Sequence, residues 1–204
     1  MSIKNNLDPR VIRTRQLLQD ALISLMEEAD FESITVQDIS KKANVNRATF
    51  YSHYEDKYSM IRQIVLEKLK AVEKAINDVQ FEEEDYQTKI DEIAYQSFLH
   101  LFEHIEENAY FYKVLLRRKG TNLFRMKLHT ILEENFLKGI SFLQPNERNF
   151  LVPAELLSNF ITGATISVIT YWLEKDMLYT PKFLAEKMLK ISKDGTLVSL
   201  GVDQ

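Results

Sequence analysis

The stretch TVQDISKKANVNRATFYSHYEDK, residues 35–57, decides the fold of this chain. Thr35 and Asp38 form an [ST]-x-x-[DE] capping box, which predicts the start of a first short helix. Asn44 lies where the chain must turn, because asparagine tolerates the left-handed conformation that most residues resist. Asn46 can cap a second helix, over residues 47–53. Two short helices joined in this way predict a helix-turn-helix, which places its second helix in the major groove of DNA.

The composition is typical of a soluble helical protein. The chain has 204 residues, of which 45% are hydrophobic and 27% charged, so a sizeable core is available. It has no cysteine, which excludes a disulfide framework and a cysteine-based zinc site. No signal-peptide core or long uninterrupted apolar run is found, so we expect a cytoplasmic protein with no membrane partner. The net charge of −4 argues against a protein that coats nucleic acid non-specifically.

Helical periodicity and cap signals predict an all-α fold with three short N-terminal helices followed by about six longer ones. The boundary between the two groups falls near residue 56. We therefore expect a helix-turn-helix DNA-binding domain at residues 1–55 and a helical effector-binding and dimerisation domain at residues 56–204. The expected helices after the helix-turn-helix span residues 56–79, 86–106, 109–118, 122–140, 153–175 and a last segment that starts at Pro181 and ends before Gly195.

Residues 43–61, ANVNRATFYSHYEDKYSMI, resemble the DNA-binding signature of the TetR family of bacterial transcriptional regulators. The chain departs from the usual pattern at Asn44, Asn46 and Tyr54, where glycine, serine and phenylalanine are typical. Residues 110–124 and 159–181 look like a subgroup common in low-GC Gram-positive bacteria. The resemblance implies an all-helical homodimer, in most cases a repressor that a small ligand releases from DNA. The matching positions are Ala43, Val45, Ala48, Thr49, Phe50, Tyr51, His53 and Lys57.

The helical wheel of the second short helix separates a core face from a DNA face. Phe50 and Tyr54 lie about 40° apart and are expected to face the core. Ala48, Thr49 and Ser52 point the opposite way, and the methyl group of Ala48 could touch a thymine methyl. Arg47, which flanks them with Tyr51, is the candidate for a bidentate guanine contact. Tyr51, His53 and Lys57 would donate hydrogen bonds to phosphates, contacts that set register and carry no sequence information. Thr35 could present its hydroxyl and its helix-start amide to a phosphate. The residues predicted to contact DNA are Arg10, Arg13, Thr35, Asn46, Arg47, Ala48, Thr49, Tyr51, Ser52, His53 and Lys57.

The charge of this region limits how it can bind DNA. Residues 1–60 carry eight Lys/Arg and nine Asp/Glu, a net charge of −1. Affinity must therefore come from the placement of basic groups and from a second copy of the module in a dimer. A two-fold dimer sets its recognition helices about one DNA turn apart and predicts a palindromic operator.

The C-terminal half offers aromatic residues for a ligand cavity and an apolar helix for a dimer. Ligand pockets are mostly apolar with a few polar groups, and helix 153–175 is apolar almost all round, more than one buried face requires. The predicted ligand-binding residues are Tyr95, Phe98, Phe102, Phe111, Tyr112, Phe136, Phe160 and Tyr171. The predicted dimer interface consists of Phe160, Gly163, Ala164, Ser167, Ile169, Trp172, Phe183 and Met188.

Three functional interpretations follow from the sequence. The first is a homodimeric repressor released from a palindromic operator by a small molecule, with no cofactor, no metal and no catalytic residue. The second is a regulator or activator of the same type controlled by a protein partner. The third is a metal-dependent hydrolase, because HLFEH at residues 100–104 matches the H-x-x-E-H motif and places His100 and His104 on one helical face.

Overall fold

The computed structural model describes residues 8–77, 90–116, 122–143 and 150–199, and these residues form helices with no strand. The predicted chain breaks at residues 81–86 and at Pro145–Asn146 lie outside them. The predicted all-α fold is confirmed, with the three N-terminal and six longer α-helices expected from the sequence. The helices are α1 (Pro9–Glu28), α2 (Val36–Lys42), α3 (Arg47–His53), α4 (Lys57–Asn77), α5 (Ile90–Glu107), α6 (Ala109–Leu116), α7 (Asn122–Leu143), α8 (Ala154–Glu174) and α9 (Pro181–Ser199), with a short 3-10 helix at Phe31–Ser33.

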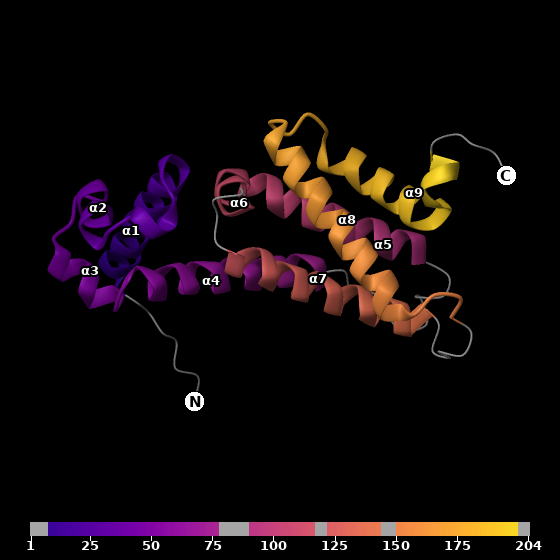
Figure 1. Ribbon diagram of the computed structural model, residues 1–204, viewed down its shortest axis with the longest axis horizontal. Coiled ribbons are helices and arrows are strands. Elements are labelled where there is room, and N and C mark those ends of the chain that lie inside the picture. The colour runs from indigo at the N-terminus through magenta and orange to yellow at the C-terminus, as the bar shows by residue number, and fades with distance from the viewer. Residues whose placement is uncertain (1–7, 78–89, 117–121, 144–149, 200–204) are drawn as a thin grey trace.

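The N-terminal helices form a small module at one end of an elongated molecule (Figure 1). The carboxylate of Asp8 accepts a hydrogen bond from the Arg10 amide at 2.8 Å, and Pro9 occupies the first turn, so α1 begins where the sequence predicts. The inner faces of α1, α2 and α3 bury Leu18, Leu22 and Ile39 completely. This packing holds the two short helices, which would not persist alone.

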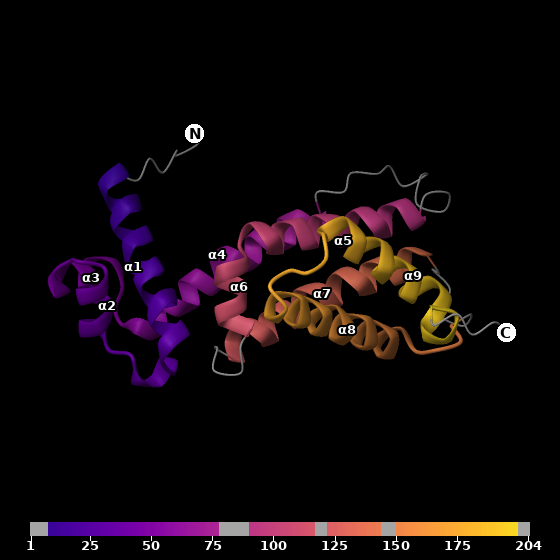
Figure 2. The ribbon, with the colours of Figure 1, turned by 90° about the horizontal axis from the view of Figure 1, so that it is seen from above.

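Helix α4 extends from this module into the C-terminal body, and both ends are packed (Figures 1 and 2). Met60 and Ile61 are buried near its start, and Val72 and Ile76 near its end. One continuous cluster of buried residues runs from α1 to α9. The two parts of the chain are therefore joined by one continuous helix and a shared core.

The C-terminal body pairs α5 with α9 and α7 with α8, while α6 lies beside both α1 and α8. By length and composition alone, α8 is the one helix among the described residues that could cross a membrane, a test that core helices of soluble proteins also pass. Its inner face buries Ile169 and Trp172 completely, whereas Leu156 and Phe160 on its outer face are 62% and 63% exposed. This helix thus contributes both to the core and to an apolar surface.

Candidate nucleic-acid interface

The turn between α2 and α3 has the conformation that the sequence predicts. Thr35 and Asp38 form the complete capping box: the Asp38 amide donates to the Thr35 hydroxyl, and the Thr35 amide donates to the Asp38 carboxylate. Asn44 has a φ of 54°, in the left-handed region. The Oδ1 atom of Asn46 accepts a hydrogen bond from the Ala48 amide at 2.9 Å and caps α3. Short-range hydrogen bonds therefore fix the position of α3 relative to α2.

Helix α3 buries one side and presents the other to solvent. Phe50 and Tyr54 are 0% and 4% exposed, and their rings pack 5.7 Å apart between centroids. Arg47, Ala48 and Ser52 lie on the exposed side, with Thr49 at its partly buried edge. The absence of a large side chain at Ala48 leaves the helix backbone accessible to a close partner. This is the division of faces expected for a helix that enters a groove.

The exposed side carries a paired arginine and tyrosine. The Arg47 guanidinium lies over the ring of Tyr51, 5.9 Å from its centroid, and donates to the Tyr51 hydroxyl at 3.4 Å. Within the described residues the guanidinium makes this one long hydrogen bond, so its other donors are available to an acceptor. Arg10 and Arg13 are exposed on the first turns of α1. Arg10, Arg13 and Arg47 are thus accessible cations of the module, together with the exposed Lys41 in the last turn of α2.

His53 sits at the partly buried end of α3. Burial, together with the nearby positive charge of Arg15, lowers the pKa of His53 below its ordinary value of 6.5. The imidazole is therefore neutral at pH 7 and can offer an N–H group without a charge. Arg15 lies over the Tyr54 ring and is paired with Glu67 of α4 at 3.5 Å, so it stabilises the junction between α1, α3 and α4.

Lys57 does not have the environment of a phosphate ligand. Its ammonium group donates to three backbone carbonyls, those of Phe31 and Ile34 at 2.9 Å and that of Glu32 at 2.8 Å. An ammonium group has three donors, so all of them are used within the chain. The ammonium also lies 4.8 Å from the centroid of the Phe31 ring. The structure thus assigns Lys57 to holding the segment between α1 and α2 against α4, a role that differs from the predicted one.

Thr35 is also occupied. Its hydroxyl donates to the Asp38 carboxylate at 2.6 Å, and its amide donates to the same carboxylate at 2.9 Å. The hydrogen bonds from Thr35 lower the pKa of Asp38, which keeps a negative charge at the start of α2. A phosphate at this position would have to displace that carboxylate, so the polar atoms of Thr35 are not presented in the way that the sequence suggests.

Most of the aromatic side chains predicted to line a ligand cavity are packed against each other in the core. Phe102 lies edge-on to Trp172 at 5.6 Å, and Phe98 lies 6.0 Å from Phe136 between ring centroids. Phe111 and Tyr112 pack on the same buried ring, Phe124. Tyr95 is partly buried beside the core, and Phe160 is exposed on α8. The buried rings among them fill the interior of the C-terminal body.

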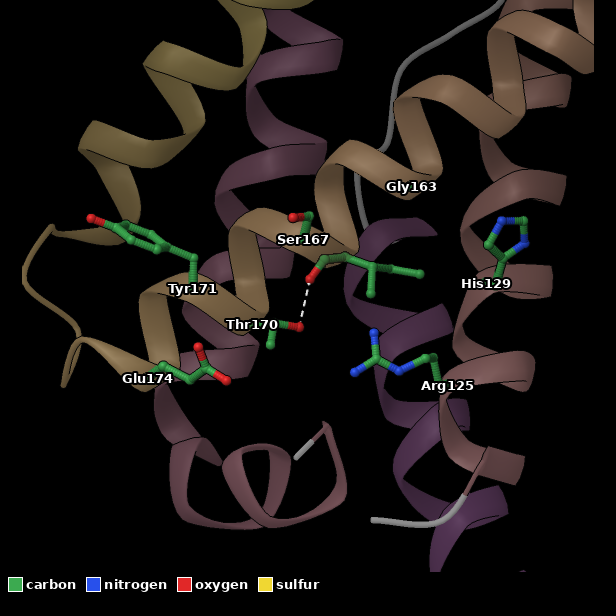
Figure 3. A pocket seen from close by; sticks show the side chains of 8 residues that line it. Arg125, His129, Gly163, Ser167, Thr170, Tyr171 and Glu174 are labelled. Atoms are coloured by element: carbon green, nitrogen blue, oxygen red, sulfur yellow. Dashed lines mark hydrogen bonds between the residues drawn. The ribbon is translucent and has the colours of Figure 1, made fainter. Parts of the chain in front are cut away.

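A pocket with a volume of about 390 Å³ lies between α7 and α8 (Figure 3). Of the predicted ligand-binding residues it contains Tyr171 alone. Arg125 and His129 lie on the α7 side, and the remaining residues extend along α8 (Figure 3). The lining consists of Arg125, His129, Gly163, Ile166, Ser167, Thr170, Tyr171 and Glu174.

The residues predicted for a dimer interface fall into two sets. Ile169, Trp172 and Met188 are 0%, 0% and 4% exposed, so they pack inside the chain and cannot present a surface to a second copy. Ala164 is partly buried. The others are exposed on the outer sides of α8 and α9: Phe160, Gly163, Ser167 and Phe183. Tyr171 and Ile191 extend this surface and are 49% and 38% exposed.

Comparison with known families agrees with this geometry. A family model described as "Bacterial regulatory proteins, tetR family" matches residues 18–64, which include α2, the turn and α3. A second, described as "Transcriptional regulator C-terminal region", matches residues 92–194, about half of the chain. The chain belongs to the TetR family.

Individual regulators resemble the chain over most of its length. An uncharacterized HTH-type transcriptional regulator of Bacillus subtilis (strain 168), YxbF, is 25% identical over an alignment of 186 residues, and the match covers 85% of this chain and 43% of that protein. The chain therefore spans less than half the length of this curated relative. A TetR transcriptional regulator from Streptococcus agalactiae has 25% identity, covers 90% of this chain and 95% of its own, and has a TM-score of 0.63. The fold is also that of the fatty acid degradation regulator FadR from Bacillus halodurans, with 17% identity, 92% and 96% coverage and a TM-score of 0.64.

Membership of the TetR family, whose members are transcriptional regulators and not enzymes, removes the hydrolase interpretation of residues 100–104. Within the described residues, no group of three or more His, Cys, Asp or Glu side chains could hold a metal ion. His104 shares a 2.8 Å hydrogen bond with the hydroxyl of Tyr112. Burial lowers the pKa of His104 and raises that of the fully buried Tyr112 phenol, so both are neutral at pH 7. The pair joins α5 to α6.

Sequence reasoning missed the polar residues of the pocket and the contacts that join the TetR module to the C-terminal body. Arg125 and His129 are four residues apart and share a helical face, a spacing visible in the sequence. The hydroxyl of Tyr110 on α6 donates to Glu27 of α1 at 3.0 Å, a contact across 83 residues that no local pattern indicates.

Proposed function

We propose that this TetR family regulator is a homodimeric repressor that binds a palindromic operator through α3 and releases it when a small molecule binds the C-terminal body. The observation that carries the DNA-binding part is the division of α3 into a fully packed core face and an exposed face of small and basic residues. In this proposal Arg47 contacts a base edge. Tyr51 and His53 flank it as donors to phosphates, with Arg10 and Arg13 supplying charge from α1.

A second copy of the chain supplies what one module lacks. Residues 1–60 carry no net positive charge, so one module has little non-specific attraction for DNA. The outer sides of α8 and α9 expose several large apolar side chains, among them Phe160, Tyr171, Phe183 and Ile191, and such a cluster is typical of an interaction surface. Pairing this surface across a two-fold axis gives a helical bundle of α8 and α9 from each copy. Two modules then share one operator.

Two connections couple the C-terminal body to α3. Helix α4 is the lever, because its first turn is fixed to the module by Lys57, and its last turns are buried in the body. Helix α6 is the second connection, through Tyr110 to Glu27 on α1 and through Lys113 to Asp176 after α8, at 2.6 Å. Consider a ligand that binds more tightly to the dimer whose two modules do not match the spacing of the operator half-sites. Such a ligand lowers operator affinity by the ratio of its affinities for the two conformations.

The experiment begins with selection of bound genomic fragments by the purified protein, followed by measurement of affinity for the selected site in the presence of cytoplasmic small molecules. The proposal predicts a palindromic site bound by two copies and weakened binding when effector is present. Control by a protein partner would appear as binding that no small-molecule fraction alters and that a co-purifying protein changes. That result would overturn the ligand-release part.

The dimer is tested separately with Phe160→Glu on α8. Leu66→Glu on α4 is the matched control, since Leu66 is 51% exposed and lies outside the proposed interface. Light scattering after size-exclusion chromatography is expected to give the mass of two chains for the wild type and the control, and of one chain for the Phe160 variant. Unchanged dimers of the Phe160 variant would place the interface elsewhere.

A further inference from the structure

The pocket between α7 and α8 has a chemical character that limits its ligand. Ile166 is buried and contributes its side chain to the base, while Ser167, Tyr171 and Glu174 lie exposed around the opening. A Cβ atom added at Gly163 would have no atom within 4 Å, so this position leaves open space. A volume of about 390 Å³ lies within the range of pockets that hold small metabolites.

Two opposite charges face the pocket without pairing with each other. Arg125 donates from one Nη atom to the Leu116 carbonyl at 2.7 Å, which fixes the guanidinium while leaving further N–H donors. Glu174 lies across the pocket on α8 (Figure 3) and has no hydrogen-bond or ion-pair partner within the described part of the chain. A ligand anion satisfies the first group, and a ligand hydroxyl donates to the second.

Other polar groups between these two charges suit the same ligand. The Thr170 hydroxyl donates to the Ile166 carbonyl at 2.8 Å, so its oxygen can still accept a hydrogen bond. His129 lies 3.7 Å from Glu133 through Nδ1 and can direct its other ring nitrogen elsewhere. Ser167 and Tyr171 add hydroxyls along α8. The pocket lining therefore combines one arginine, one glutamate and the hydroxyl groups of Ser167, Thr170 and Tyr171.

We infer that this pocket binds a small anion that also carries hydroxyl groups, such as a hydroxylated carboxylate or a phosphate ester, with Arg125 holding the anion and Glu174 accepting from a hydroxyl. The inference names the ligand class for the effector site of the proposed function and rests on it only there. Arg125 also donates to the carbonyl of Leu116, the last residue of α6. The residue that holds the anion is therefore hydrogen-bonded to a helix that contacts α1. Ligand binding competes for or tightens this link.

The test is direct binding to the full chain without DNA, followed through the fluorescence of Trp172. The chain has one tryptophan, which is buried, donates to the Tyr179 carbonyl at 2.7 Å and neighbours the pocket residue Tyr171 in sequence. The probes are sodium gluconate and glucose 6-phosphate, with uncharged glucose and hydroxyl-free acetate as controls, all at constant ionic strength. Saturable binding of gluconate or glucose 6-phosphate at least about tenfold tighter than that of glucose and acetate is expected, since a charge-assisted hydrogen bond contributes that much.

Two matched pairs of variants locate the binding. Arg125→Gln is expected to weaken binding at least about tenfold, and Lys127→Gln on the same helix by less than about twofold. Gly163→Leu fills the pocket, whereas Gly139→Leu, at a second helix position with open space for a Cβ atom, does not. Because Gly163, Ser167 and Tyr171 also lie on the proposed dimer surface, the mass of each variant is measured with and without the anion.

The outcomes separate this inference from the proposed function. Loss of binding in the Arg125 and Gly163 variants, with both controls unaffected, supports the inference. Equal binding of glucose and gluconate, binding unaffected by Arg125→Gln and Gly163→Leu, or no saturable binding of either anionic probe overturns it. A protein that binds its operator normally but binds neither anion refutes the ligand class alone. Failure to bind any operator refutes the proposed function, because ligand titration needs no DNA.

Discussion

The predicted effect of removing the Lys57 ammonium group can be worked out from its contacts. Lys57→Met keeps most of the apolar stem and deletes three donors to the carbonyls of Phe31, Glu32 and Ile34. Hydrogen bonds to a charged group contribute about 1.5–3 kcal/mol each. In the variant, water can bind the exposed carbonyl of Glu32 in place of the ammonium. Water reaches the part-buried carbonyls of Phe31 and Ile34 less easily, so those two hydrogen bonds are lost. The two part-buried bonds, each taken at the lower value of about 1.5 kcal/mol, together predict that the free energy of unfolding falls by about 3 kcal/mol.

The assay is equilibrium unfolding in urea, with Lys41→Met on the exposed side of α2 as the control. In urea the Lys57 variant is expected to lose about 3 kcal/mol, and in a parallel thermal unfolding experiment about 6–12 °C in melting temperature, against about 1 °C or less for the control. Operator affinity is then measured against salt below both melting points. A phosphate contact would contribute about 0.9 to the slope of log affinity on log salt, and no such change is expected for Lys57→Met. Wild-type stability with a reduced slope would refute the reasoning and restore Lys57 as a DNA contact.

Three further predictions concern the turn, a buried pair and the recognition helix. Asn44→Ala should lower the free energy of unfolding by about 1 kcal/mol, because of its positive φ, while Asn44→Gly should not lower it; urea unfolding decides, and equal stability of Ala and Asn would contradict the account. The folded pKa of His104 lies below 6.5, so its contribution to stability is complete above that pH and declines as the pH falls toward the folded pKa; His104→Gln should flatten this decline, and an unchanged pH profile would exclude the pair as its source. Arg47→Ala should cost about 1–3 kcal/mol of operator affinity and relax selectivity at one base position in each half-site, whereas Lys182→Ala on α9 should do neither.

The sequence predicts local structure well because the relevant interactions are local. The capping box of Thr35 and Asp38, the left-handed turn at Asn44 and the buried faces of Phe50 and Tyr54 depend on neighbours within a few residues. These features follow from hydrogen-bonding capacity and helical periodicity alone. The position of the recognition helix could therefore be predicted before any tertiary contact was known.

The role of Lys57 could not be predicted, because its partners lie 23 to 26 residues earlier in the chain. A lysine at the start of a helix next to a DNA-binding motif has the same local sequence whether it contacts a phosphate or caps carbonyls. Only packing of α4 against the segment after α1 decides between the two. The same limit applies to the contact between Tyr110 and Glu27.

Aromatic residues are ambiguous for a different reason. Phe102, Phe111 and Tyr112 are as suitable for a core as for a cavity lining, and composition does not separate the two. In the structure Phe111 packs against Tyr112 and Phe102 against Trp172, while the pocket is lined mostly by polar side chains from α7 and α8. The inward orientation of Trp172 and Ile169 could not be predicted either. Helix α8 is apolar almost all round, so its sequence does not determine how the helix is rotated about its own axis.

The central claim, that two copies of α3 bind a palindromic site, is tested most directly by hydroxyl-radical footprinting of the purified protein on a selected genomic fragment. The account predicts two protected half-sites related by a two-fold axis and centred about one helical turn apart or somewhat more, with Arg47→Ala weakening protection symmetrically in both. A single protected segment would contradict the account. So would loss of the protection when a competitor duplex of unrelated sequence is added at the same concentration as the labelled fragment.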